Sequence, residues 1–75
     1  MNTDRRKRIA KIISELSNLE SQIEEVREEE QEAFDNLPES FQSGEQGQKM
    51  EEAINQLEEA VNSCHEAQDT LECVE

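Results

Sequence analysis

The spacing of the apolar residues constrains this chain more than any other feature of its sequence. From Ile9 onward they recur at alternating steps of three and four positions, the heptad pattern of a helix that packs along one seam. The a positions of this register are Ile9, Leu16, Ile23 and Leu37. The d positions are Ile12, Leu19, Val26 and Ala33. The pattern predicts a long helix that packs against another helix through these two columns.

A second heptad register begins at Met50. Its a positions are Met50, Leu57, Cys64 and Leu71. Its d positions are Ala53, Ala60, Ala67 and Val74. Small alanines in one helix opposite larger Ile and Leu side chains in the other allow two backbones to approach closely. We therefore expect the two helices to pack against each other.

The chain between the two registers carries signals that end one helix and begin the next. Pro38 ends the first helix, because the residue before a proline is displaced from the helical region. The segment Ser43–Gln46 fits a capping box, in which the Ser43 hydroxyl accepts from amides of the first turn. Gly47 follows within that turn and lowers helix stability, so we expect this helix end to fray.

These signals predict an all-α fold, an antiparallel two-helix hairpin of the coiled-coil type. The whole chain, residues 1–75, forms one domain, with a helix at residues 4–36, a loop at residues 37–43 and a helix at residues 44–73. A chain of 75 residues buries only a thin core of its own.

Apolar side chains also flank the a/d seam at e positions, which widens the apolar stripe beyond what one partner helix covers. We therefore expect a homodimer of hairpins that forms a four-helix bundle, or a hairpin that completes itself on a host protein. The expected dimer seam is Ile13, Phe34, Ile54 and Val61.

The net charge and the absence of long apolar runs exclude further classes of function. The chain has 20 Asp and Glu against 7 Lys and Arg, a net charge of -13, which argues against direct binding to nucleic acid. An apolar run of about 18 residues, long enough to cross a membrane, is absent from the sequence. The apolar stretch after the first basic residues is interrupted by Lys11, too early for a signal peptide. We expect a cytoplasmic protein with two free cysteines.

The charges are also separated along the chain. Beyond residue 11 the only cations are Arg27 and Lys49, against 19 acidic residues. A hairpin brings the acids of both helices together near the bend, at about one net negative charge per 2 Å, close to the value of about one per 1.7 Å in duplex DNA. We expect this acidic tip to bind a protein with a basic or nucleic-acid-binding surface, although acidic faces of coiled coils are also commonly just solvated. The acidic tip comprises Glu24, Glu25, Glu28, Glu29, Glu32, Asp35, Glu45, Glu51, Glu52, Glu58 and Glu59.

The basic residues gather at the other end of the hairpin. They begin the first helix, where positive charge opposes the helix dipole. We expect acids at the end of the second helix to lie beside them and offset this cost. The basic residues are Arg5, Arg6, Lys7 and Arg8, and the expected acids are Asp69, Glu72 and Glu75.

Few residues suggest chemistry. Cys64 and His65 point about 100° apart on a helix, and Cys73 lies on the opposite side from Cys64, so we expect neither a metal site nor a disulfide. Two helices offer no pocket for catalysis, so we expect a protein that is not an enzyme and has no cofactor. Phe41 either joins a small apolar cap over the turn or serves as an exposed apolar anchor for a partner.

The sequence EAFDNLPES at residues 32–40, followed by MEEAI at 50–54 and LEEA at 57–60, resembles small acidic helical-hairpin (coiled-coil) proteins encoded by phages and prophages. Most of these have no assigned function. The resemblance implies a phage or mobile-element origin and a location in a bacterial host, where such proteins often inhibit nucleases, restriction enzymes or CRISPR effectors. It carries over no functional residue.

Three functions follow from these observations. The first is a non-enzymatic inhibitor of a host defence or nucleic-acid-binding protein, acting by acidic nucleic-acid mimicry. The alternative is a structural or assembly coiled-coil adaptor that docks through its apolar stripe and Phe41. A small-ligand sponge at an oligomer interface ranks last, because the seam lacks aromatic residues and buried cations.

Overall fold

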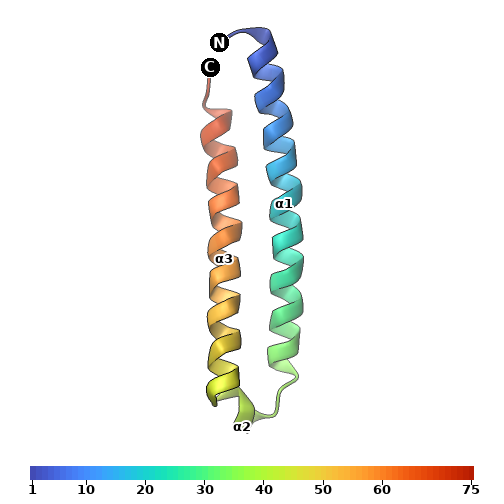
Figure 1. The fold of residues 1–75 in the computed structure, drawn as a ribbon, viewed down its shortest axis with the longest axis vertical. Coiled ribbons are helices and arrows are strands. Elements are labelled where there is room, and N and C mark those ends of the chain that lie inside the picture. The colour runs from blue at the N-terminus through green and yellow to red at the C-terminus, as the bar shows by residue number, and fades with distance from the viewer.

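A computed structural model describes residues 1–75. Its elements are α1 (Thr3–Asp35), α2 (Glu39–Gln42) and α3 (Glu45–Glu72), so the predicted all-α fold is confirmed. The long helices α1 and α3 run side by side in opposite directions, α2 forms the bend, and both termini lie at the other end (Figure 1). The molecule is a rod of 58 × 14 × 11 Å.

The ends of the long helices follow local signals. The side chain of Asn2 caps α1, its Oδ1 accepting from the backbone N–H of Arg5 at 2.8 Å, as expected of a residue that satisfies a first-turn donor. α1 ends at Asp35, shortly before Pro38. The predicted helices at 4–36 and 44–73 each begin and end one residue away from the ends of α1 and α3.

The start of α3 differs from the prediction, because the expected loop at residues 37–43 contains α2. The N-cap of α3 is Gly44, and no side chain caps it. Ser43 instead ends α2, and its hydroxyl donates to the carbonyl oxygens of Glu39 at 3.3 Å and Ser40 at 3.5 Å. The predicted capping box is therefore wrong, since its hydroxyl is used by the preceding turn.

Gly47 is buried, whereas the sequence suggested a fraying helix end. A Cβ atom added at this residue would lie 2.7 Å from the Cα of Gln42 and closer still to its carbonyl group. The side chain of Gln42 turns the other way, its Nε2 donating to the carbonyl oxygens of Phe34 at 3.1 Å and Leu37 at 3.0 Å. Gln42 thus joins the end of α1 to the first turn of α3, and Gly47 provides the space for it.

The packing face of α1 is rotated relative to the predicted a/d seam. Its a residues Ile9, Leu16 and Ile23 are half-buried. Its d residues are exposed, with relative accessible areas of 44% for Ile12, 49% for Leu19 and 49% for Val26. The prediction that these d residues pack inside the hairpin is therefore wrong.

The e column takes the place of the d column. Ile54 on α3 is the most buried apolar residue, at 6% exposure, and Ile13, Phe34 and Val61 are half-buried. These four residues were expected to remain outside the hairpin as a dimer seam, but the hairpin already covers most of their surface. The uncovered apolar surface of α1 is instead its d column, called here the α1 stripe and comprising Ile12, Leu19 and Val26.

Candidate functional site

Polar side chains connect the two long helices midway along the rod. The carboxylate of Glu20 lies 3.2 Å from Nδ1 of His65 and accepts from Nε2 of Gln68 at 3.3 Å. Gln68 also donates to the carbonyl oxygen of Cys64 at 3.2 Å. Glu20 occupies an e position of α1, so this column contacts α3 through polar as well as apolar side chains.

Arg27, one heptad further along the same column, makes the second polar connection. Its guanidinium donates to Glu24 on the same helix and lies 3.8 Å from Oε1 of Glu58 on α3. The hydrogen bond to Glu24 raises the pKa of Arg27 above its ordinary value, as does the nearby charge of Glu58. Since Glu20 and Arg27 both turn toward α3, the neighbouring d column turns outward.

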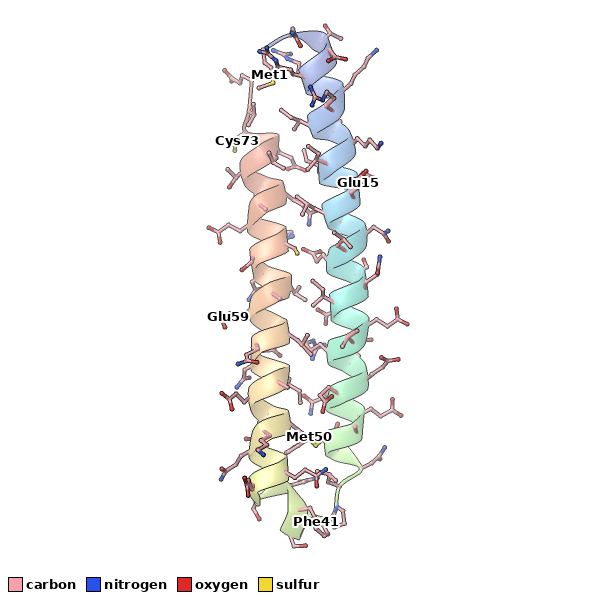
Figure 2. The ribbon with its side chains drawn as sticks, viewed as in Figure 1. Met1, Glu15, Phe41, Met50, Glu59 and Cys73 are labelled. Carbon is pink, nitrogen blue, oxygen red and sulfur yellow. The ribbon has the colours of Figure 1, made fainter.

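The structure brings the acidic residues of α1 and α3 into the same half of the rod, next to the bend (Figure 2). Of the predicted acidic tip, only Glu24 is half-buried and the others are exposed. Glu59 lies near the middle of the rod and on the side of α3 away from α1 (Figure 2). The acids therefore extend over the outer sides of both helices and are not confined to the bend.

Both cations in this half of the rod are paired with acids. Arg27 is shared between Glu24 and Glu58, and Lys49 lies 3.5 Å from Glu45. The remaining acids of the tip have no basic residue within ion-pair distance. These unpaired acids are Glu25, Glu28, Glu29, Glu32, Asp35, Glu51, Glu52 and Glu59.

The basic end, defined here as Arg5, Arg6, Lys7 and Arg8, is exposed and also unpaired. The ion pair nearest to it is Lys11 with Glu15 at 3.9 Å, within α1. None of the acids expected to compensate it on α3 forms an ion pair with it. The start of α1 and the acidic end of α3 lie at the same end of the hairpin, as predicted, but no ion pair joins them, and four cations face solvent at a helix N-terminus.

Phe41 lies on α2 at the outermost part of the bend (Figure 2) and is 55% exposed. Phe34, Leu37 and Met50, expected to form an apolar cap with it, are half-buried. Phe41 therefore stands outside any such cap, and its surface is open to a partner.

Other kinds of site find little support among these residues. No group of three or more His, Cys, Asp or Glu is placed to hold a metal ion. Neither long helix combines the length and apolar character needed to cross a bilayer. Cys64 is half-buried and Cys73 exposed, and both are free thiols.

Comparison of the chain with protein-family models, curated proteins and solved structures gave no match. The function is therefore argued from the surfaces just described. Sequence reasoning missed the α1 stripe and the unpaired state of the basic end. The sequence carries no signal for this rotation of α1, because heptad patterns assign polar e residues such as Glu20 and Arg27 to solvent.

Proposed function

We propose that the chain is a non-enzymatic, phage-type interaction protein whose acidic tip binds a basic, nucleic-acid-binding surface of a host protein in the bacterial cytoplasm. Binding would inhibit that protein by excluding its nucleic acid. The observation that carries the proposal is the set of eight unpaired, exposed acids in one half of the rod. Carboxylates without cations nearby retain the field that attracts a basic partner and accelerates association.

The charge pattern is costly for a protein that needs only stability. A coiled coil built for stability interleaves Lys and Glu at its e and g positions, so that helices attract each other. Here Arg27 and Lys49 are the only cations near the bend, and each already has an acidic partner. The rod is 58 Å long, so its acidic half spans about 29 Å, the length of about 8 base pairs at 3.4 Å each.

We also infer that two hairpins associate through the α1 stripe into a four-helix bundle. Exposure of nearly half the surface of Ile12, Leu19 and Val26 leaves apolar area that a second hairpin would remove from water. Full burial of such a side chain contributes about 1.5–3 kcal/mol. Sedimentation that shows a helical monomer at micromolar concentration would refute this association.

The inhibitor proposal is tested by capturing partners from a bacterial host lysate and then measuring binding of the purified partner. We expect affinity to fall steeply between about 0.1 M and 0.5 M NaCl, because screening weakens exposed charge pairs. We also expect DNA bound to the partner to prevent the complex. A complex that survives about 0.5 M NaCl unchanged, or that forms equally well on the DNA-bound partner, contradicts the mechanism.

A triple variant removes three unpaired acids from the tip while leaving every observed ion pair in place. It should bind the partner about threefold to a hundredfold more weakly, at roughly 0.2–1 kcal/mol for each exposed pair and 1.4 kcal/mol for a factor of ten. The variant is E28Q/E29Q/E52Q.

The matched control changes net charge equally but at the open end, with acids that also make no ion pair. We expect its affinity to stay within about twofold of the parent, because charges beyond a Debye length are largely screened. Equal losses in the two triple variants would show that net charge alone, and not the tip, governs binding. The control is D4N/E72Q/E75Q.

The second candidate is an adaptor that docks on a partner protein through apolar surface. The exposure of the α1 stripe and of Phe41 at 55% favours it. In that case the tip variant would bind normally, whereas Phe41→Ala would weaken the complex, because a buried aromatic contributes strongly to binding. The two variants therefore separate the two functions.

A further inference from the structure

We propose that the two hairpins of the dimer pack antiparallel, so that the basic end of each copy lies beside the acidic tip of the other. The inference rests on the dimer proposed above and adds its orientation. Four observations carry it: the position of the α1 stripe, the unpaired basic end, the unpaired acids near the bend and the length of α1.

The α1 stripe is symmetric about its middle residue. Leu19 is the central residue of the stripe and also the central residue of α1, which extends from Thr3 to Asp35. A two-fold axis at Leu19 therefore places Ile12 level with Val26 of the second copy and lets the two rods overlap over their full length. A two-fold interface, in which the same surface of each copy forms the contact, is the commonest arrangement in homodimers.

The apolar residues alone do not choose the orientation. In a parallel pair, Ile12, Leu19 and Val26 would each meet their own counterpart and be covered equally well. The orientation is decided by the charges that flank the stripe, because the half of the rod at the bend is strongly acidic whereas the open end carries four exposed, unpaired cations.

Only the antiparallel pair brings opposite charges together. With Leu19 on the axis, residues 5–8 of one copy lie level with residues 30–33 of the other, which include the exposed Glu32 and directly follow the exposed Glu29. The four cations of the basic end have no acidic partner within their own chain, and at the start of α1 they oppose its dipole. A second copy would place further acids beside these four unpaired cations.

A parallel pair would instead set acidic tip against acidic tip. At about 0.15 M salt the Debye length is about 8 Å, so charges at the same level along two packed rods still interact while distant ones do not. Parallel packing thus adds local repulsion at both ends, and antiparallel packing adds local attraction at both ends.

This orientation extends the proposed function. The two acidic tips stand at opposite ends of the dimer, and acids on the outer sides of α1 and α3, such as Glu59, remain uncovered. A dimer would then offer two separate sites for basic partner proteins.

The first test measures the distance between spin labels on a cysteine at position 40 in a dimer of the S40C/C64A/C73A variant by pulsed electron paramagnetic resonance. Ser40 is exposed and lies on α2, at the bend. Antiparallel packing about Leu19 places the two bends at opposite ends, and we expect a separation of about 45–55 Å from the helix rise between Leu19 and the end of α1. Labels at the same end of a parallel bundle would lie within about 30 Å, given interaxial distances of about 8–10 Å.

The outcomes separate the inference from the proposed function. A short distance overturns the antiparallel orientation while leaving the dimer in place. A monomer in sedimentation, with no dipolar signal between labels, overturns both the dimer and its antiparallel orientation. If the S40C/C64A/C73A variant fails to fold, the second test decides, since it needs no change in the seam.

The second test removes the basic end in the variant R5Q/R6Q/K7Q/R8Q and measures the dimer dissociation constant by sedimentation at about 0.15 M salt. Loss of attraction in an antiparallel dimer should raise this constant about tenfold or more, since exposed pairs contribute up to about 1 kcal/mol each. In a parallel dimer the same change relieves repulsion between two basic ends, so an unchanged or lower constant overturns the inference. The control is Lys11→Gln, whose cation is already paired with Glu15, and it should change the constant by less than about twofold.

Discussion

At the bend, α2 turns back on the first turn of α3, and Gln42 donates to the carbonyl oxygens of Phe34 in α1 and of Leu37 just beyond it. Both nearby cations have acidic partners. At the open end, no hydrogen bond or ion pair joins α1 to α3 beyond the contact of Glu20 with Gln68. The four cations of the basic end make no ion pair. The bend is thus specified within one chain, whereas the open end presents groups that a second molecule can use.

The most buried apolar side chain also lies in the half of the rod that contains the bend, and shortening it should have the largest effect on stability. Ile54 is 6% exposed, so Ile54→Ala should cost about 2–4 kcal/mol of unfolding free energy, the usual loss for a buried large-to-small change. Urea unfolding followed by circular dichroism measures it.

The matched control is Ile12→Ala near the open end, where the side chain is 44% exposed. At protein concentrations low enough to keep the chain monomeric, we expect it to cost less than about 1 kcal/mol, since much of its area is already in water. Equal costs at the two positions would contradict the contrast between the ends. A cost for Ile12→Ala that grows with protein concentration would support its burial in a dimer.

The close approach of Gly47 to the backbone of Gln42 at the bend gives the second-largest expected effect on stability. Gly→Ala inside a helix ordinarily stabilises it by about 1 kcal/mol, but at Gly47 the new Cβ would overlap the backbone of Gln42. We expect Gly47→Ala to lower the unfolding free energy by about 1–3 kcal/mol, the range for overpacking. A stabilised variant would show that the bend does not depend on this close approach.

Gly44 provides the control, because it is the other glycine at the bend and an added Cβ there would make only ordinary contacts at 3.5 Å. It is the N-cap of α3 and lacks a side-chain acceptor. Gly44→Ser supplies one, and we expect a gain of a few tenths of a kcal/mol in the same urea experiment. Opposite signs at the two glycines would locate the constraint in the contact of Gly47 with Gln42.

The sequence predicted the helices better than their rotation, for a physical reason. Helix ends depend on local signals such as Pro38, and each lies one residue from its expected position. The rotation of α1 depends on Glu20 and Arg27, whose partners Gln68 and Glu58 are far away in the chain. Heptad patterns assign polar e residues to solvent, so the exposed α1 stripe could not be predicted without these distant partners.

For the candidate surfaces too, the sequence predicted what depends on chain reversal but not what depends on contacts between distant residues. The excess of acids near the bend follows from chain reversal alone, and the structure places both acidic runs in that half of the rod. The state of the basic end depends on how far α3 extends and where its side chains point, and composition carries no information on either. Gly47 was misread for a related reason, since its role depends on the return of α2 against α3.

A substitution at the open end should have the smallest effect on stability, and the sign of that effect shows whether Arg6 has a partner within its own chain. Arg6 is exposed in the first turns of α1 and makes no ion pair, so its charge opposes the helix dipole without compensation inside the chain. We expect Arg6→Glu to stabilise the monomeric hairpin by about 0.3–1 kcal/mol, the usual size of such dipole effects, and to lose this gain in high salt. Thermal unfolding at low protein concentration, in low and in high salt, measures it. A destabilised monomer would show that Arg6 has an attractive partner within its own chain, and the contrast between the two ends would then fail.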